Sequence, residues 1–250
     1  IFTVTNSKGL SDSEQIVITV NSANLPPAMS PLADKTINEG QRILMYARAS
    51  DPNQDRLIFS AGNLPSGAMF QTVLLADVTG DGLINILDTQ VALNALGTNT
   101  PEYDFDNNGN VDILDVQLIN NQFGYTSDSP GAILAGRMEW TADYTQSGSY
   151  LAIFSATDPQ GASDSQTLQI TVNNVNRAPV LTTISSPSVS EGAALNFTVS
   201  ATDPDGDGMT YLWTRTGGTG PAPGSLSDPA TLTPSFTPAG PGTQLFVLRA

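Results

Sequence analysis

Apolar residues fall at every second position along most of the chain. Ile16, Ile18 and Val20 alternate with polar residues, and the segment 195–201 repeats this pattern. Because successive side chains of a strand point to opposite faces, a period of two predicts strands with one buried face. Gly, Pro, Asn and Asp interrupt the runs at short intervals, which favours short strands in two-sheet sandwiches over a disordered linker.

The chain contains an internal repeat with an offset of 152 residues. IFTVTNSKGLSDSEQIVITV (1–20) aligns without a gap with IFSATDPQGASDSQTLQITV (153–172). The same offset places the Glu-Gly pair at 39–40 on that at 191–192, so each copy is predicted to be one structural unit. The expected domains are the terminal strands of a preceding unit (1–22), a split sandwich (23–71 and 136–175), an insertion (72–135) and a second sandwich (176–250).

The insertion contains two twelve-residue loops built on one template, DVTGDGLINILD (77–88) and DFDNNGNVDILD (104–115). In each loop oxygen-bearing residues alternate and position 6 is glycine (Gly82 and Gly109). This spacing suits calcium, because a tight turn aims several side-chain oxygens and one carbonyl at a single ion. The predicted ligands are Asp77, Thr79, Asp81, the Leu83 carbonyl, Asn85 through water and Asp88, and, in the second loop, Asp104, Asp106, Asn108, the Asn110 carbonyl, Asp112 and Asp115. Since a hydroxyl is a poorer ligand than a carboxylate, Thr79 predicts that the first site is the weaker.

A short amphipathic helix is expected after each loop. Val91, Ala92 and Leu96 follow the first loop, and the segment 118–123 matches them after the second. Gly97 and Gly124 provide the stop signals.

The charge balance strengthens the metal interpretation. The chain has 9 Lys and Arg against 24 Asp and Glu, which argues against nucleic acid or an anionic membrane surface as a partner. Between Leu57 and Gly136 there is no Lys or Arg, while this stretch carries nine acidic residues. Divalent cations would offset that repulsion and couple binding to folding. The alternative is that these are ordinary solvated acidic turns.

Most enzyme chemistry is excluded by composition. The sequence has no His and no Cys, so imidazole acid–base catalysis, Cys nucleophiles, disulfides and the usual zinc sites are absent, and we expect no enzyme. Trp140 and Trp213 lie in strand-like alternation, which favours burial over a role as sugar platforms.

No apolar run is long enough to span a bilayer, so the chain is not expected to be membrane-embedded. It opens at Ile1 without a signal-like segment, and we interpret it as an internal piece of a longer protein.

Several motifs in fixed order resemble prokaryotic immunoglobulin-like and cadherin-like surface repeats of the dystroglycan type. They are LPSGAMF (64–70), the stretch MEWTADYTQSGSYLAIFSATD (138–158), the strand SDSQTLQITV (163–172), the junction NVNRAPV (174–180) and the turn DPDGD (203–207). The later copy, with TYLWTRTGG, is similar to the polycystic-kidney-type (PKD-like) variant. The resemblance implies a mainly β fold of tandem Ig-like sandwiches in an extracellular or cell-surface protein.

The insertion, over about residues 74–125, resembles a type I dockerin module. It has two loops with Asp at position 12 and no helix before the first loop. The resemblance implies two calcium ions and docking to a cohesin-like protein through positions 10 and 11. Here these positions are Ile86-Leu87 and Ile113-Leu114, and the alternative is that part of each pair packs inside the insertion.

The resemblance to cadherin-like arrays also implies calcium at the domain junctions. The candidate ligands are Glu39, Asn174, Asn176, Asp203, Asp205 and Asp207. The earlier junction offers Asn21, Asn24, Asp51, Asn53 and Asp55. An Asp-Pro-Asp-Gly-Asp sequence is also a favourable turn without metal.

The function that we expect is that of a non-enzymatic, calcium-binding structural or adhesive repeat protein in a cell-surface array or head-to-tail filament. In the filament, residues 1–20 of one copy complete the last sandwich of the next, which lacks its final strand. The alternatives are cohesin docking as the main role, and an accessory region of a secreted polysaccharide-degrading enzyme.

Overall fold

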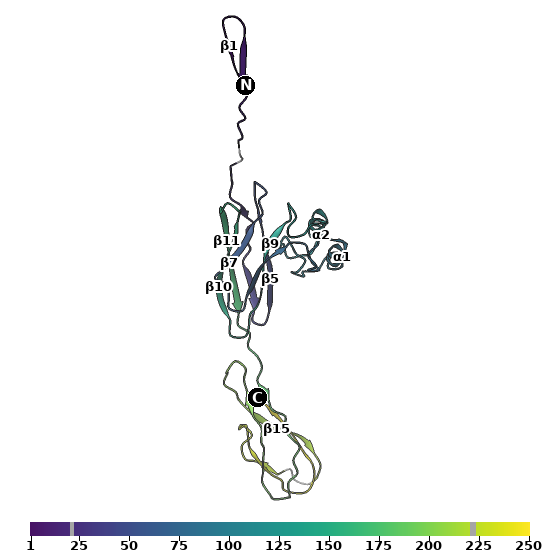
Figure 1. Ribbon diagram of the computed structural model, residues 1–250. Coiled ribbons are helices and arrows are strands. Elements are labelled where there is room, and N and C mark those ends of the chain that lie inside the picture. The colour runs from purple at the N-terminus through teal and green to yellow at the C-terminus, as the bar shows by residue number, and fades with distance from the viewer. Residues whose placement is uncertain (21–22, 221–223) are drawn as a thin grey trace. The chain divides into compact units, whose positions relative to one another are not determined.

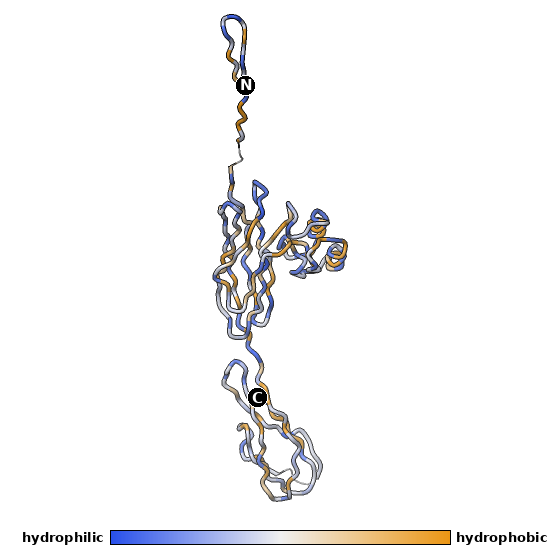
Figure 2. The backbone as a smooth tube through the Cα atoms, viewed as in Figure 1, coloured by the Kyte–Doolittle hydropathy of each residue, from blue (hydrophilic) through white to orange (hydrophobic). Residues whose placement is uncertain are grey.

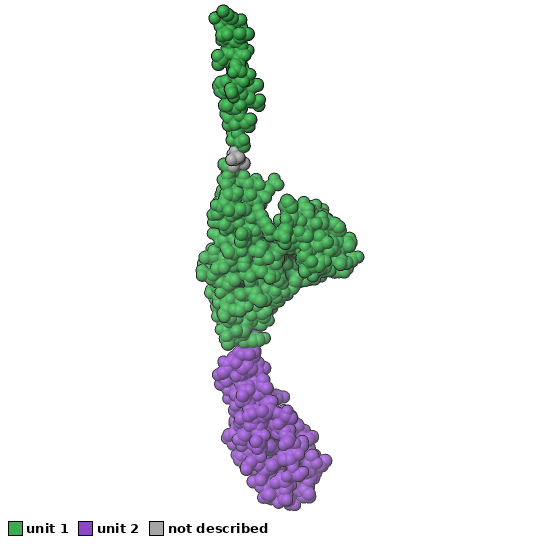
Figure 3. All heavy atoms as spheres, viewed as in Figure 1, with its two compact units in different colours: residues 1–173 green, residues 174–250 purple. Residues whose placement is uncertain are grey.

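The computed structural model describes residues 1–20, 23–220 and 224–250, which form two compact units, Ile1–Asn173 and Asn174–Ala250 (Figure 3). Strands dominate both units, and the described residues contain two short helices, α1 (Ile86–Asn94) and α2 (Ile113–Asn121) (Figure 1). The predicted mainly β fold with a small helical insertion is confirmed. Neither helix is long and apolar enough to cross a membrane.

The sandwich of unit 1 consists of two sheets. One sheet has the order β4-β11-β10-β7, and the other has the order β5-β9-β8, while β3 pairs with β6. The bounds are β3 Ala28–Met29, β4 Lys35–Asn38, β5 Arg42–Ala47, β6 Ala49–Ser50, β7 Ile58–Gly62, β8 Met69–Leu74, β9 Leu134–Thr141, β10 Gly148–Thr157 and β11 Ser163–Asn173. The second, fifth and fourth strands of an immunoglobulin sandwich correspond to β5, β9 and β8, and its third, sixth and seventh strands to β7, β10 and β11. Unit 1 therefore contains an Ig-like sandwich.

The core of this sandwich follows the alternation of the sequence. Ala152, Phe154 and Ala156 of β10 are fully buried, while the residues between them are more exposed. Trp140 of β9 is 1% exposed and its Nε1–H donates to the Ser66 carbonyl at 3.1 Å, which confirms its predicted burial.

The insertion occupies the connection between β8 and β9. These strands are antiparallel neighbours that end opposite each other at Leu74 and Leu134. The Leu75 N–H donates to the Ile133 carbonyl at 2.8 Å, so the insertion leaves and rejoins the sheet at one place. Because the two ends are adjacent, a folded module fits here without changing the register of the sheet. Figure 1 shows α1 and α2 beside the sandwich, near β9.

Unit 2 is built from shorter strands around its own core. The strands are β12 Val180–Leu181, β13 Leu195–Asn196, β14 Ala201–Thr202, β15 Leu212–Gly218, β16 Ser225–Leu226, β17 Ser235–Thr237 and β18 Gln244–Arg249. They pair as β12-β14, β13-β17-β16 and β15-β18. The core comprises Phe197, Val199, Trp213, Phe236 and Leu248, with the Phe197 and Trp213 rings stacked 4.4 Å apart.

Residues 1–14 form an isolated hairpin of β1 (Phe2–Thr5) and β2 (Ser11–Glu14). The following Ile18 is 76% exposed, whereas Ile170, its counterpart in the repeat, is fully buried in β11. The segment around Ile18 therefore has the sequence pattern of a sandwich strand, but its apolar side chains are not buried.

Candidate metal centre

Two backbone hydrogen bonds tie each loop of the insertion to another segment of the module. They are made by Ile84 and Val111, both at position 8 and both fully buried. The Ile84 N–H donates to the Tyr125 carbonyl at 2.9 Å and its carbonyl accepts from the Gly124 N–H at 2.8 Å. Val111 makes the same two bonds with Thr98 and Gly97, at 2.8 and 2.9 Å. Each loop thus pairs with the segment after the other loop's helix.

The backbone of the first loop folds around the side-chain carboxylate of Asp77. The two carboxylate oxygens of Asp77 accept from the N–H groups of Gly80 and Gly82, at 2.8 and 2.9 Å. Asp81 accepts from the Leu83 N–H at 2.9 Å, and Gly82 has a φ of +86°, as expected for position 6. Each carboxylate oxygen keeps a second lone pair that can coordinate a cation.

The second loop has a similar arrangement around Asp104, with position 5 instead of position 4 as the second donor. The Asp104 oxygens accept from the N–H groups of Asn108 and Gly109, at 3.0 and 2.8 Å. One carboxylate oxygen from each of Asp104, Asp106 and Asp115 lies within 4.8 Å of the other two. Three carboxylates at this separation repel one another unless protons or a cation intervene.

In each loop, one side-chain amide donates hydrogen bonds to two oxygens of the predicted ligand residues. In the first loop the Asn85 Nδ2 group donates to Asp81 Oδ2 and to the Leu83 carbonyl, both at 3.1 Å. In the second loop Asn108 Nδ2 donates to Asp106 Oδ2 at 3.0 Å and to Asp112 Oδ2 at 3.3 Å. Oxygens that converge on a positively polarised group also suit a hard cation, so the donor set fits calcium.

The aspartates at position 12 connect each loop to its helix. Asp88 is fully buried and accepts from the N–H groups of Val78, Thr79 and Asn85, at 2.7 to 2.9 Å. Asp115 is 1% exposed and accepts from those of Phe105 and Asp112, at 2.7 and 2.8 Å.

Each position-12 aspartate also completes a capping box, with Asn85 or Asp112 as the N-cap residue. The alternation of ligand residues points to metal coordination but not to this capping role. An Asn or Asp three residues before an acidic residue, at the start of an apolar run, is the signal that could have found it.

Burial raises the pKa of the Asp104 and Asp115 carboxyl groups, and the neighbouring Asp106 adds to the increase for both. A raised pKa means that this environment disfavours the charged form. A divalent cation acts in the opposite direction, because it favours the ionised carboxylates.

The apolar pairs at positions 10 and 11 lie at the start of the two helices and face solvent. Ile86, Leu87, Ile113 and Leu114, which we call the twin-helix patch, are 52 to 57% exposed, so none of the four packs into the core of the insertion. The buried face of the helices is instead centred on Ala92 and Ile119, while Leu96 and Phe123, the last apolar residues of the expected amphipathic stretches, lie beyond the helix ends and are 41% and 50% exposed. In Figure 2 both helices carry hydrophobic residues.

The predicted junction ligands are divided between the units. Glu39 belongs to unit 1, is buried, and accepts from the Ser147 N–H at 2.8 Å. Asn174, Asn176, Asp203, Asp205 and Asp207 belong to unit 2.

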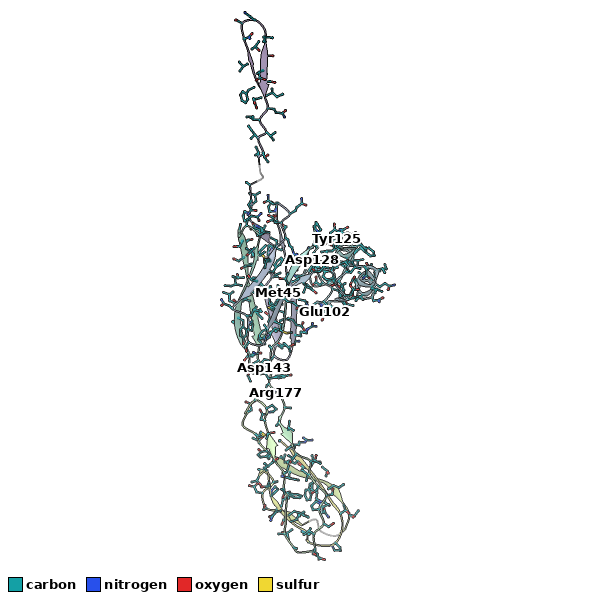
Figure 4. The ribbon with its side chains drawn as sticks, in the orientation of Figure 1. Met45, Glu102, Tyr125, Asp128, Asp143 and Arg177 are labelled. Carbon is teal, nitrogen blue, oxygen red and sulfur yellow. The ribbon has the colours of Figure 1, made fainter. Side chains whose placement is uncertain are left out.

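Within unit 2, Asp205 forms a salt bridge with Arg177, which lowers the pKa of Asp205 (Figure 4 labels Arg177). Asp203 accepts from the N–H groups of Asp205 and Asp207, at 2.9 and 3.1 Å, and so closes a local turn. Calcium at this junction stays a prediction.

A carboxylate cluster at one end of the unit 1 sandwich combines two predicted residues with one that the sequence did not indicate. One carboxylate oxygen from each of Asp51, Asp55 and Asp158 lies within 4.8 Å of the other two. Asp158 is 3% exposed and accepts from Asn24 Nδ2 at 2.7 Å. Asp51 Oδ2 is buried and has no hydrogen-bond partner among the described residues. Asn21 of the same prediction lies outside the described residues.

Comparisons with known proteins identify related folds. No family model matches the chain. A 53-residue stretch, 20% of this chain and 6% of the matched protein, is 45% identical to a curated chitinase A from Pseudoalteromonas piscicida. The chain thus matches a small part of that protein's length.

Among solved structures, the chain is similar to the SrpA adhesin from Streptococcus sanguinis (12% identity, TM-score 0.34, 76% of this chain and 92% of that chain). It is also similar to the tandem Ig repeats of Dlar (11%, 0.30, 91% of each chain). A third similar structure is an endo-fucoidan hydrolase of glycoside hydrolase family 107 (15%, 0.33, 98% of this chain and 32% of that chain). These similarities concern the fold, which the strand order above defines independently.

Proposed function

We propose that this chain is part of a non-enzymatic, extracellular repeat protein in which calcium holds a helical module on the side of a β-sandwich. The observation that carries the proposal is the cluster of three carboxylates in the second loop, whose oxygens lie within 4.8 Å of one another. One of them, Asp104, also accepts two backbone hydrogen bonds from its own loop. In the first loop, Asp77 also accepts from the glycine at position 6, while its other hydrogen bond comes from position 4 instead of position 5. Calcium has a structural role in this proposal.

The chemistry of the donors favours calcium over transition metals. All predicted ligands are carboxylate, amide, hydroxyl or carbonyl oxygens, and the sequence has no His or Cys. Twelve-residue loops with several carboxylates also tolerate the variable coordination number of calcium better than the strict octahedron of magnesium.

Calorimetric titration of the chelator-treated full chain with calcium chloride tests the proposal. We expect binding at both loops, together with an increase in the helical circular dichroism signal. The double variant Asp104→Asn, Asp106→Asn should lose the second-loop site. The matched control Asp128→Asn, which changes an exposed carboxylate of the insertion outside both loops, should keep it. Absence of binding to the wild-type chain overturns the proposal.

We extend the calcium proposal to the cluster of Asp51, Asp55 and Asp158. A buried carboxylate oxygen without a hydrogen-bond partner is costly, and a cation shared by the three groups would remove that cost. Asp158→Asn should remove one calcium from the titration and leave both loop sites unchanged. An unchanged stoichiometry in Asp158→Asn contradicts this site.

A second candidate function is docking to a cohesin-like protein through the twin-helix patch. Four large apolar side chains, each more than half exposed and repeated in both halves, support an interaction surface. The chain should bind an immobilised cohesin-like domain only in the presence of calcium, and replacement of all four residues by Ser should abolish binding. Calcium titration of the Ser variant is the control, because its loops should bind as in the wild type. Calcium-independent binding, or binding that survives the substitutions, argues against this function.

We also propose that copies associate head to tail by strand addition. In unit 1, β11 lies between β10 and β4. In unit 2, the repeat places residues 187–190 at the position of β4, and β18 is the last strand. A groove of about 710 Å³ is lined by residues 184–189 and 240–246, together with Glu191, Phe197, Trp213 and Phe236. Residues 11–20 have the sequence pattern of β11, and in a second copy they are exposed and available for this groove.

A role as an accessory region of a secreted polysaccharide-degrading enzyme remains the third candidate. Its support is the 53-residue match to the chitinase. Detection of a catalytic domain in the same full-length polypeptide is the measurement that checks it.

A further inference from the structure

The second calcium loop is attached directly to an edge of the sandwich. Asn107 is at position 4 of this loop, and its Oδ1 accepts from the Tyr46 N–H at 3.3 Å. Its Nδ2 donates to the Tyr46 carbonyl at 2.7 Å. Because a side-chain amide offers the same donor and acceptor as a peptide group, Asn107 pairs with β5 as a strand of one residue would.

Four further contacts connect residues 102–105 to the same strand and the residue after it. Arg48 Nη1 donates to the Phe105 carbonyl at 3.2 Å, and the rings of Tyr46 and Phe105 pack 5.8 Å apart. The Tyr46 hydroxyl donates to the Glu102 carbonyl at 3.0 Å, and Arg42 forms a salt bridge with the Glu102 carboxylate. Figure 4 labels Glu102 at this side of the insertion. Phe105 is 2% exposed and belongs to the same core as the sandwich.

The first loop differs at the corresponding position. Its position 4 is Gly80, which has no side chain and no atom within 4 Å of where a Cβ would lie. Both residues have a positive φ, +72° for Gly80 and +59° for Asn107, so the loop backbones are alike at this position. At position 4, therefore, the two loops differ in the side-chain amide and its contact with β5.

We propose that β5 pre-organises the second loop for calcium and that Asn107 is the positioning residue for this effect. The inference rests on the proposed calcium function and assigns an unequal role to the two loops. A loop that is already held in its binding conformation loses less conformational entropy when the ion binds, so its affinity is higher. By linkage, calcium in the second loop also stabilises the contact between the insertion and β5.

Asn107→Gly is the variant that isolates the effect. Glycine adopts the positive φ of this position without strain, so the loop backbone is preserved while both hydrogen bonds to Tyr46 are removed. Gly80→Asn is the matched control, because it adds the same side chain at the same loop position, where its Cβ meets no atom within 4 Å.

Each site is titrated alone in the full chain. With the first loop silenced by Asp77→Asn and Asp81→Asn, Asn107→Gly should weaken calcium binding about tenfold, which is about 1.4 kcal/mol. With the second loop silenced by Asp104→Asn and Asp106→Asn, Asn107→Gly and Gly80→Asn should both leave the remaining site unchanged. Arg48→Met, a change in the sandwich that touches no loop carboxylate, should weaken the second site severalfold.

Hydrogen exchange provides the second readout. Calcium should slow exchange of the β5 amides in the wild type, and this protection should be lost in Asn107→Gly. Wild-type affinity of the second loop in both Asn107→Gly and Arg48→Met, or β5 exchange that calcium does not change, overturns the inference while the calcium function stands. No calcium binding to the wild type contradicts the proposed function itself.

Discussion

Single carboxylates of the insertion each have two roles. Asp115 accepts from two backbone N–H groups, one at the start of the second loop and one at the N-cap of α2, and is also the predicted last ligand of the loop. Asp112 caps the same helix by accepting from the Leu114 N–H at 2.7 Å. Substitutions that keep the size of the side chain can separate the two roles.

Asp115→Asn should destabilise the insertion by roughly 2 kcal/mol even with chelator present. One of its two acceptor oxygens becomes an NH₂ group facing a buried N–H, which leaves two donors without acceptors. The helical circular dichroism signal during thermal unfolding measures the loss. Asp112→Asn is the control, since Asn is as good an N-cap as Asp, and its stability without calcium should be nearly unchanged. Equal losses in the two variants would contradict the assigned hydrogen bonds.

Because its hydroxyl is buried, Tyr46 should make the folded chain less stable at high pH. Burial raises the pKa of Tyr46 to about 12, while an unfolded tyrosine ionises near 10. Between these values the unfolded chain has lost the proton and the folded chain keeps it, so stability falls as the pH rises through this window. Relative to Tyr46→Phe, the wild type should lose roughly 2 to 3 kcal/mol by pH 12. Denaturant unfolding of both proteins between pH 9 and pH 12 measures this, and parallel curves would contradict it.

At the scale of elements, the β8–β9 pair carries the insertion and fixes its position. Its middle is tightly packed at Gly136, which pairs with Thr72 of β8 and Ala47 of β5. A Cβ at this position would lie 2.4 Å from the Phe70 ring and 3.2 Å from the Phe59 Cβ. The absence of a side chain here lets the two sheets approach each other.

Gly136→Ala should therefore destabilise the sandwich by about 1–3 kcal/mol, because the Phe70 ring has to move from its place against Phe154. Gly62→Ala in β7, where a Cβ meets no atom within 4 Å, should change stability by less than about 0.5 kcal/mol. Chemical unfolding followed by tryptophan fluorescence compares the two. A neutral Gly136→Ala would show that the packing around Phe70 is looser than the structure indicates.

At the scale of the whole molecule, the repeat relates a buried strand to an exposed one. Ile18 is the counterpart of the buried Ile170, whereas Val17 is the counterpart of Gln169 on the other face of β11. Strand addition places the Ile18 side chain in the groove of unit 2 and leaves the Val17 side chain outside, because neighbouring residues of a strand point to opposite faces.

Ile18→Lys should abolish self-association of the chain, since it places a charge beside the aromatic lining residues Phe197, Trp213 and Phe236, and Val17→Lys should not. Sedimentation velocity over a range of protein concentrations measures the assembly state. A wild-type chain that is monomeric at high concentration, or equal effects of the two substitutions, would rule out this mode of assembly.

The sequence by itself determined the features that depend on neighbouring residues. Alternation predicted the long strands β9, β10 and β11, but it was wrong for residues 15–20 and 197–200, which alternate in the same way and form no strand. The loop template predicted the two turns with glycine at position 6, since φ at Gly82 and Gly109 is a local property. The apolar stretches after the loops predicted both helices. The local sequence pattern did not indicate which helix residues are buried, because the residues of the twin-helix patch are as apolar as the residues that face the core.

Only the tertiary structure decided which distant residues meet. Asp158 joins Asp51 and Asp55 because the strands that carry these turns lie in one sandwich, and Asn107 meets Tyr46 because β5 is at the edge of its sheet. The partners in these contacts are 61 or more residues apart in the chain. The sequence pattern of one segment does not indicate which distant segment it will contact. Strand order and packing fix such contacts, so they become visible only once the chain is folded.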